Sequence, residues 1–147
     1  HLADLSMLEP LAEIMRQHPP PWLADAEIGA LLAMPLSKER RLYRGFNQAD
    51  ELAARLAQHY GRPLLPRDAV FRRHHAPQST LKSDERHRNV RHAFAVQSGL
   101  VKNCNLLLID DVVTTGATLN ELARVLKRAG AGRIFCWTLA RAQMKIF

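Results

Sequence analysis

The chain has 147 residues, of which 47% are hydrophobic, and its formal net charge is +7. This length suits one globular domain with a hydrophobic core. The longest nearly apolar run, residues 28–36, contains Pro35 and is much shorter than the roughly 18 residues of a membrane helix, which excludes a transmembrane span. The excess of Lys and Arg favours anionic partners, either polyphosphate substrates or nucleic acid.

The two cysteines, Cys104 and Cys136, are far apart and form no C-x-x-C pair. We interpret them as reduced core thiols rather than as a disulfide or a zinc site, which favours a cytoplasmic protein. Because the chain begins with His1 instead of an initiator Met, we expect it to be processed, truncated or part of a longer sequence.

The first part of the chain predicts one helix and one strand. Apolar residues between Met7 and Met15 recur near helical spacing, and the prolines at 19–21 cannot continue a helix. We expect residues 1–27 to form a peripheral helical segment and residues 28–147 to form the main domain. The short apolar run at 28–34 predicts the first core strand, which Pro35 leads into a loop.

The loop after this strand is strongly basic. Its charged and polar residues include Ser37, Lys38, Glu39, Arg40, Arg41 and Arg44. Such a cluster is commonly a solvated surface, and binding of an anion is the alternative. After the loop, apolar spacing predicts a helix from Gln48 to Tyr60 that Gly61 ends.

Residues 69–71 and 94–96 predict two short strands, separated by a long polar stretch. Residues 72–90 contain almost no core-forming side chains, so we expect a long mobile loop, and an inert insertion is the alternative. Four histidines in or just after this stretch could suggest a metal site: His74, His75, His87 and His92. No cysteine or acid completes a known ligand spacing, so surface or loop positions are expected.

The most informative stretch is residues 106–119, which read LLLIDDVVTTGATL. The aliphatic run at 106–109 has no polar interruption, as in a strand buried on both faces of a parallel sheet. Asp110 and Asp111 then stand at the carboxyl end of that strand, the edge of an open α/β sheet where ligands bind. A turn at residues 99–103 is expected before the strand.

The turn after the two acids has the composition of a phosphate site. Residues 114–118 are small or hydroxylated, and they precede a helix whose buried stripe includes Leu122 and Leu126 and which Gly130 ends. Free N–H groups at a helix start, together with Thr hydroxyls, bind phosphate. The acids would face vicinal hydroxyls or a hydrated Mg²⁺, and the combination describes a phosphorylated ribose. The next strand is expected at 134–139, followed by Arg141 as a weak candidate ligand contact.

The DDVVTTGAT motif resembles the phosphoribosyl pyrophosphate (PRPP) binding motif of type I phosphoribosyltransferases. A Walker B strand also ends in acids, but no G-x-x-x-x-G-K-[ST] motif occurs in the sequence. The segment PLSKERRLYRGFNQADELAARLA resembles the RGFNQ signature of the competence protein F (ComF/GntX-like) branch. That branch usually reads P-V-P-L before the loop, where this chain has Ala33, Met34, Pro35 and Leu36.

The resemblance implies a fold and a set of site residues. The fold is α/β, a single domain with a mainly parallel sheet flanked by helices. The implied PRPP-binding residues are Asp110, Asp111, Val112, Val113, Thr114, Thr115, Gly116, Ala117 and Thr118. The implied pyrophosphate loop contains Leu36, Ser37, Lys38, Arg40 and Arg41. The implied flexible lid contains Gln78, Ser79, Lys82, Arg86 and Asn89.

The resemblance also implies a function. Asp110, Asp111 and Arg40 are the expected catalytic residues of a phosphoribosyl transfer to an unknown acceptor, with Mg²⁺ bound through PRPP and not directly by protein ligands. The alternative is a non-catalytic module, responsive to PRPP or binding single-stranded DNA, in natural transformation. Expected partners are PRPP, pyrophosphate, single-stranded DNA, DNA-uptake proteins and a second copy in a homodimer. Relatives commonly carry an upstream zinc-binding segment, whose cysteines this sequence lacks.

Overall fold

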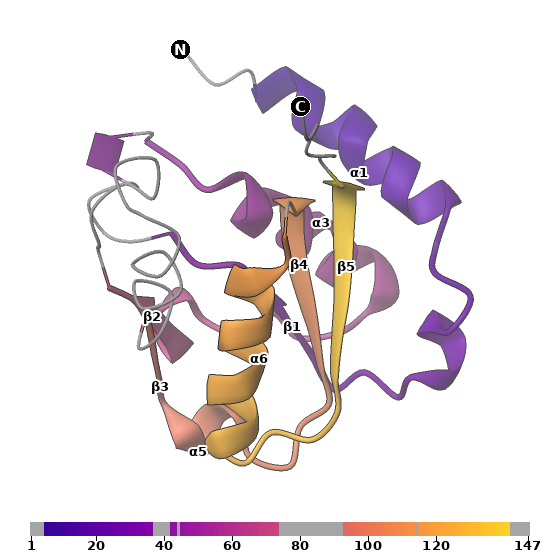
Figure 1. Ribbon diagram of the computed structural model, residues 1–147. Helices are drawn as coiled ribbons and strands as arrows, with labels where there is room; N and C mark the ends of the chain where they lie inside the picture. Colours follow the sequence, from indigo (N-terminus) through magenta and orange to yellow (C-terminus); the bar gives the residue numbers. More distant parts are fainter. Residues whose placement is uncertain (1–4, 37–41, 44, 74–92, 114, 142–147) are drawn as a thin grey trace, which may run out of the picture.

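A three-stranded parallel sheet forms the centre of the molecule (Figure 1). The computed structural model describes residues 5–36, 42–43, 45–73, 93–113 and 115–141. The strands are β1 (Ala30–Ala33), β4 (Leu106–Val113) and β5 (Ile134–Arg141), in the order β1-β4-β5. On the outer side of β1, Leu64 forms an isolated parallel bridge with Leu31.

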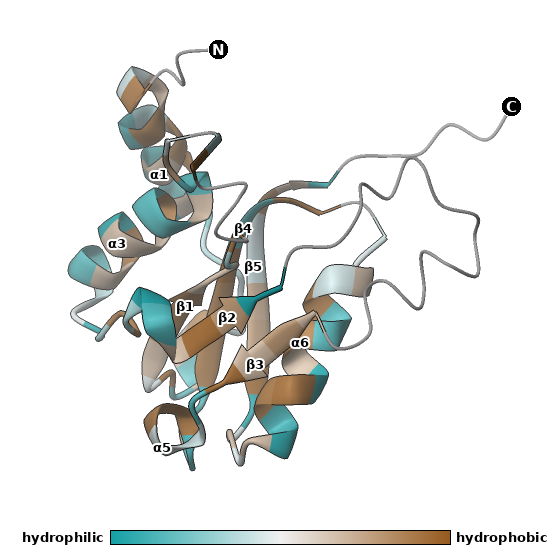
Figure 2. Ribbon diagram, turned by 90° about the vertical axis from the view of Figure 1, so that its left-hand side faces the viewer, coloured by the Kyte–Doolittle hydropathy of each residue, from teal (hydrophilic) through white to brown (hydrophobic). Residues whose placement is uncertain are grey.

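Helices cover both faces of this sheet. Helix α3 (Gln48–Tyr60) packs on β1 and β4, and α1 (Leu8–Gln17) packs in turn on α3. Helix α6 (Ala117–Arg128) lies on the opposite face, so the molecule has helix, sheet and helix layers (Figure 2). Each helix buries one apolar stripe, exemplified by Leu56 in α3 and Leu126 in α6, both fully buried.

A small antiparallel hairpin lies beside the main sheet. It consists of β2 (Val70–Arg72) and β3 (Phe94–Val96), and β3 contacts α6. The remaining elements are short: η1 (Leu5–Met7), η2 (Leu23–Asp25), η3 (Arg67–Ala69) and α5 (Ser98–Val101). The residues between the two hairpin strands include 74–92, which lie outside the described part of the chain.

The aliphatic half of β4 is the centre of the core. Leu106, Leu107, Leu108 and Ile109 are each at most 1% exposed, because β4 lies between two strands and between two helical layers. Burial of each such side chain contributes roughly 1.5–3 kcal/mol to the free energy of unfolding. The predicted α/β fold with a parallel sheet flanked by helices is therefore confirmed.

The central strand is longer than its sequence pattern predicts. It continues through both acids to Val113, because β5 is equally long and pairs Asp110 with Thr138 and Val113 with Arg141. The turn expected at 99–103 is in part a short helix, α5.

The expectation that both cysteines are core thiols is wrong for Cys136. Both cysteines are free, Cys104 is partly buried, and Cys136 is exposed. The strand β5 is at the edge of the three-stranded sheet and is covered less completely than β4. Trp137 lies on its covered face and is buried, whereas the adjacent Cys136 lies on the opposite face. The division into residues 1–27 and 28–147 stays a prediction, and α1 buries Leu8, Ala12 and Met15 toward the rest of the core.

Candidate functional site

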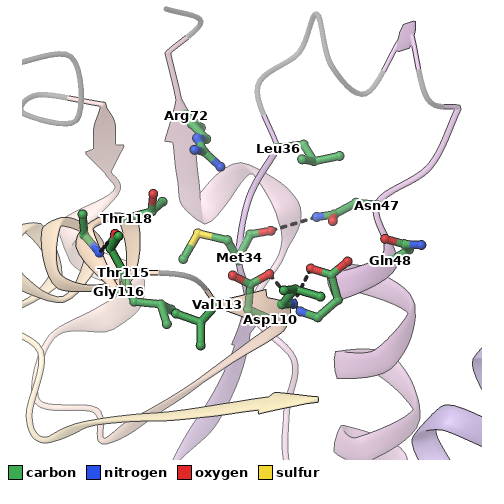
Figure 3. Close-up of a pocket in the computed structure, with 14 residues that line it drawn as sticks. Met34, Leu36, Asn47, Gln48, Arg72, Asp110, Val113, Thr115, Gly116 and Thr118 are labelled. Atoms are coloured by element: carbon green, nitrogen blue, oxygen red, sulfur yellow. Dashed lines mark hydrogen bonds between the residues drawn. The ribbon is translucent and has the colours of Figure 1, made fainter. Parts of the chain in front are cut away.

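A cavity of about 210 Å³ opens at the carboxyl ends of β1 and β4 (Figure 3). Four parts of the chain line it: the segment after β1, the start of α3, the end of β2, and β4 with the turn into α6. The lining residues are Met34, Leu36, Asn47, Gln48, Arg72, Asp110, Asp111, Val112, Val113, Thr115, Gly116, Ala117, Thr118 and Leu119. The cavity thus lies where the sequence predicts ligand binding.

The two carboxylates line this cavity from adjacent positions of β4. Both side chains line the same cavity, and they lie close enough for the Asp111 carboxylate to interact with that of Asp110. Oδ1 of Asp110 accepts a hydrogen bond from the backbone N–H of Asp111 (2.9 Å), and Oδ1 of Asp111 accepts from the N–H of Val112 (2.8 Å). These local bonds leave each carboxylate with further acceptor capacity toward a ligand.

Partial burial changes the acidity of Asp110. Desolvation, reinforced by the neighbouring Asp111 carboxylate, raises the pKa of Asp110 from its ordinary value of 3.8 to about 7. The Arg72 guanidinium acts in the opposite direction and lowers this pKa. The cavity therefore holds a carboxyl group whose charged form is only partly compensated by neighbouring groups, and a hydroxyl donor or a cation would compensate it further.

The turn into α6 has the geometry of an anion site. Gly116 is the N-cap residue in a left-handed conformation (φ 79°), which glycine adopts without the steric cost of a Cβ. The N–H of Ala117 donates to Thr115 Oγ1 (3.3 Å), and the first backbone bond of the helix runs from Asn120 N–H to Gly116 O (2.8 Å). The N–H groups of the first turn and the helix dipole can therefore hold a phosphate at this edge of the cavity.

Arg72 is a cavity residue that the sequence alone does not single out. Its Nη1 donates to the carbonyl oxygen of Pro35 (3.3 Å), and its guanidinium lies 5.6 Å from the ring centroid of Phe94, its partner across the hairpin. In the sequence Arg72 is merely the first residue of a polar stretch, and its pairing with Phe94 gave no signal there. The hairpin thus brings a cation to the carboxylate pair.

Asn47, Gln48 and Met34 also line the cavity and are absent from the predicted site. Asn47 and Gln48 belong to the RGFNQ segment, and the resemblance of this segment to the ComF branch was the sequence feature that could have identified them. Asn47 is buried and caps α3, whereas Gln48 is exposed.

Nine predicted site residues that the structure describes line the cavity, and the roles of all the predicted site residues stay predictions. Those that line the cavity are Leu36, Asp110, Asp111, Val112, Val113, Thr115, Gly116, Ala117 and Thr118. Those outside the described residues are Thr114, Ser37, Lys38, Arg40, Arg41, Gln78, Ser79, Lys82, Arg86, Asn89 and the histidines at 74, 75, 87 and 92. Arg141 ends β5 and is not among the lining residues.

Within the described segments, no three His, Cys, Asp or Glu side chains gather closely enough to hold a metal ion. Two adjacent carboxylates still fit a hydrated Mg²⁺ that is held mainly by ligand oxygens. Among the same residues, no helix combines the length and apolarity needed to cross a membrane.

Known structures share this fold. Adenine phosphoribosyltransferase from Saccharomyces cerevisiae superposes with a TM-score of 0.59 at 13% identity, covering 95% of this chain and 70% of the yeast chain. The adenine phosphoribosyltransferase of Thermoanaerobacter pseudethanolicus gives 0.56 at 14% identity, covering 95% and 82%. Residues 42–145 match the family described as phosphoribosyl transferase domain. The chain therefore belongs to the phosphoribosyl transferase domain family, and its fold is that of the type I phosphoribosyltransferases.

Sequence relatives place the chain in the competence protein F branch of this family. Competence protein F of Haemophilus influenzae is 36% identical over 115 residues, which are 77% of this chain and 50% of the relative. Competence protein ComFC of Bacillus subtilis is 39% identical over 113 residues, 76% of this chain and 44% of the relative. DNA utilization protein YhgH of Escherichia coli K12 is 37% identical over 112 residues, which are 76% of this chain and 48% of the relative. The chain spans about half the length of these relatives.

Proposed function

We propose that this domain binds PRPP with Mg²⁺ and transfers its phosphoribosyl group to an acceptor that is still to be identified. One observation carries the proposal: the carboxylate pair of β4 and the open N-terminal turn of α6 line the same cavity. A ribose 5-phosphate unit presents a diol and a phosphate, and this cavity offers acceptors for the first and donors for the second.

The ribose and its phosphate would be held by different backbone elements. The N–H groups at the start of α6 and the hydroxyls of Thr115 and Thr118 would bind the 5-phosphate. Asp110 and Asp111 would accept hydrogen bonds from the two ribose hydroxyls. Because β4 and α6 are joined by one short turn, the spacing between the two subsites is set by the fold.

Asp110 and Asp111 would lie beside a hydrated Mg²⁺ that is bound through the oxygens of PRPP, and this ion would supply neutralisation of the charge on the pyrophosphate. Among the described residues, Arg72 is the cationic side chain that lines the cavity. We expect Lys38, Arg40 and Arg41 of the pyrophosphate loop to bind the pyrophosphate together with it. Cationic side chains stabilise the negative charge that grows on the leaving pyrophosphate.

The proposed reaction is a displacement at C1 of the ribose. The bond from C1 to the pyrophosphate oxygen breaks, its electron pair leaves with pyrophosphate, and a lone pair of the acceptor forms the new bond to C1. The acceptor then loses its proton to solvent or a nearby base. The carboxylates hold the ribose while positive charge develops at C1, and no covalent nucleophile is needed. The residues predicted to form the lid, 78–89, would exclude water during this step.

A role in DNA uptake is a second part of the proposal. The names of the relatives refer to competence and DNA utilization, which supports this context. Binding of single-stranded DNA, homodimer formation and a cytoplasmic location stay predictions. No contact among the described residues favours the single-strand module over the enzyme.

The experiment that tests the proposal is pyrophosphate release. The protein is incubated with PRPP and Mg²⁺ against a panel of nucleobases, ammonia and glutamine, and pyrophosphate is measured. We expect release with one acceptor class and none after the double substitution Asp110→Asn plus Asp111→Asn. The matched control is Asp25→Asn plus Asp68→Asn, two acids outside the cavity. PRPP binding without release for any acceptor would favour the non-catalytic module.

A further inference from the structure

The buried side chain of Asn47 joins the two elements that form one wall of the cavity. Its Nδ2 donates to the carbonyl oxygen of Met34 (2.9 Å), and its Oδ1 accepts from the N–H of Ala49 (3.2 Å). The residue is 6% exposed, although it follows a loop and lines the cavity. Both ends of the amide are thus used, one on the segment after β1, as Figure 3 shows, and one on the first turn of α3.

The bond to Met34 fixes the point at which the chain leaves the sheet. The N–H of Met34 donates to the carbonyl oxygen of Ile109 in β4 (2.8 Å). The carbonyl oxygen of Met34 accepts the hydrogen bond from Asn47 Nδ2. Pro35 follows and has no N–H to give. The next carbonyl, that of Pro35, accepts from Arg72. Two consecutive carbonyls are therefore held by side chains that also line the cavity.

We infer that Asn47 is a positioning residue for the pyrophosphate end of the ligand, and this inference rests on the proposed function. A carbonyl oxygen that faced the pyrophosphate would repel it, and the Asn47 and Arg72 donors neutralise both carbonyls at the start of the loop. The cradle for the 5-phosphate, in contrast, would be made by the turn between β4 and α6, and no hydrogen bond among the described residues joins this turn to Asn47. Loss of the Asn47 donor should therefore weaken one end of the ligand and not the other.

The substitution that separates the two tasks of this residue is Asn47→Ser. A serine hydroxyl caps a helix nearly as well as asparagine does, so α3 keeps its first turn. The shorter side chain no longer reaches Met34. The second variant, in case Asn47→Ser does not fold, is Asn47→Thr, which keeps a capping hydroxyl and fills more of the vacated space. The matched control is Gln97→Ala, because Gln97 Nε2 likewise donates to a carbonyl, that of Asp68 (3.1 Å), away from the cavity.

The test compares two ligands by calorimetry on the full chain: PRPP with Mg²⁺, and ribose 5-phosphate, which lacks the pyrophosphate. For Asn47→Ser we expect the Kd of PRPP to rise about tenfold, the effect of one lost hydrogen bond near a charged ligand, and that of ribose 5-phosphate to change less than about twofold. Gln97→Ala should change neither Kd. Equal loss for both ligands would show a merely structural role and overturn the inference, as would no loss for PRPP. Wild-type protein that binds neither ligand would overturn the proposed function and this inference with it.

Discussion

The backbone N–H of Asp111 donates a 2.9 Å hydrogen bond to the side chain of Asp110, and the carboxylates of both residues line the same cavity. Burial and the Asp111 carboxylate raise the pKa of Asp110 to about 7, and Arg72 opposes this rise. The fold therefore tolerates an electrostatic cost at the position where the proposed ligand needs an acceptor.

The substitution Asp110→Asn should stabilise the protein at neutral and basic pH. The folded-state pKa of Asp110 lies above its ordinary value, so its contribution to stability is greatest below about pH 4 and is lost as the pH rises through about 7. Removing the charge should add about 1–2 kcal/mol to the free energy of unfolding at pH 8, allowing for solvent screening of this partly exposed group, and almost nothing at pH 3.5. Urea unfolding at both pH values measures it. An equal gain at both, or a loss at pH 8, would refute the assigned cause.

The substitution Arg72→Gln should raise the pKa of Asp110 further, because the guanidinium, together with the backbone N–H of Asp111, lowers it. The carboxyl pKa can be followed by NMR titration of the Asp side chains. Arg73→Gln is the matched control, since Arg73 is the exposed neighbour of Arg72 and does not line the cavity. If both variants shift the Asp110 titration equally, the effect is one of net charge, and the specific role of Arg72 fails.

The substitution Gly116→Ala should destabilise the fold through its backbone. Gly116 has φ 79°, and the nearest atom to an added Cβ is 4.0 Å away, so conformational strain and not a clash decides the outcome. The expected cost is about 1–2 kcal/mol. Gly99→Ala is the control, because Gly99 lies in α5 with open space around it and should become neutral or slightly more stable. A neutral Gly116→Ala would contradict the described turn.

Helix α1 should be held by its apolar face and not by its ion pairs. Glu9 links Arg16 and Arg55 across α1 and α3, but its own side chain is 61% exposed. Glu9→Gln should therefore change stability barely, and less in high salt. Met15→Ala removes a buried side chain and should cost about 2–4 kcal/mol. Thermal unfolding of the two variants gives the comparison. A larger loss for Glu9→Gln would reverse this account of α1.

The parts of the fold that local pattern determines could be predicted. The run at 106–109 is apolar throughout because both faces of β4 are covered. Gly61 ends α3 in the left-handed conformation (φ 61°), which glycine adopts more readily than other residues do. The acids and the glycine turn could be placed at a sheet edge because strand ends and helix starts have strong local signals.

The parts that depend on distant partners could not be predicted. The extension of β4 to Val113 requires β5 beside it, and the exposure of Cys136 follows from the outer position of β5 in the sheet. Arg72 and Asn47 reach the cavity by bonds to Pro35 and Met34, which are 37 and 13 positions away in sequence. No periodicity within one segment reports such contacts.

Calorimetric titration with PRPP in the presence of Mg²⁺ is the most direct test of the central claim. The wild-type domain should bind PRPP, and Asp110→Asn plus Asp111→Asn should abolish this binding while the protein stays folded by circular dichroism. The control Asp25→Asn plus Asp68→Asn should bind as the wild type does. Undiminished PRPP binding by the folded Asp110→Asn plus Asp111→Asn variant would contradict the account.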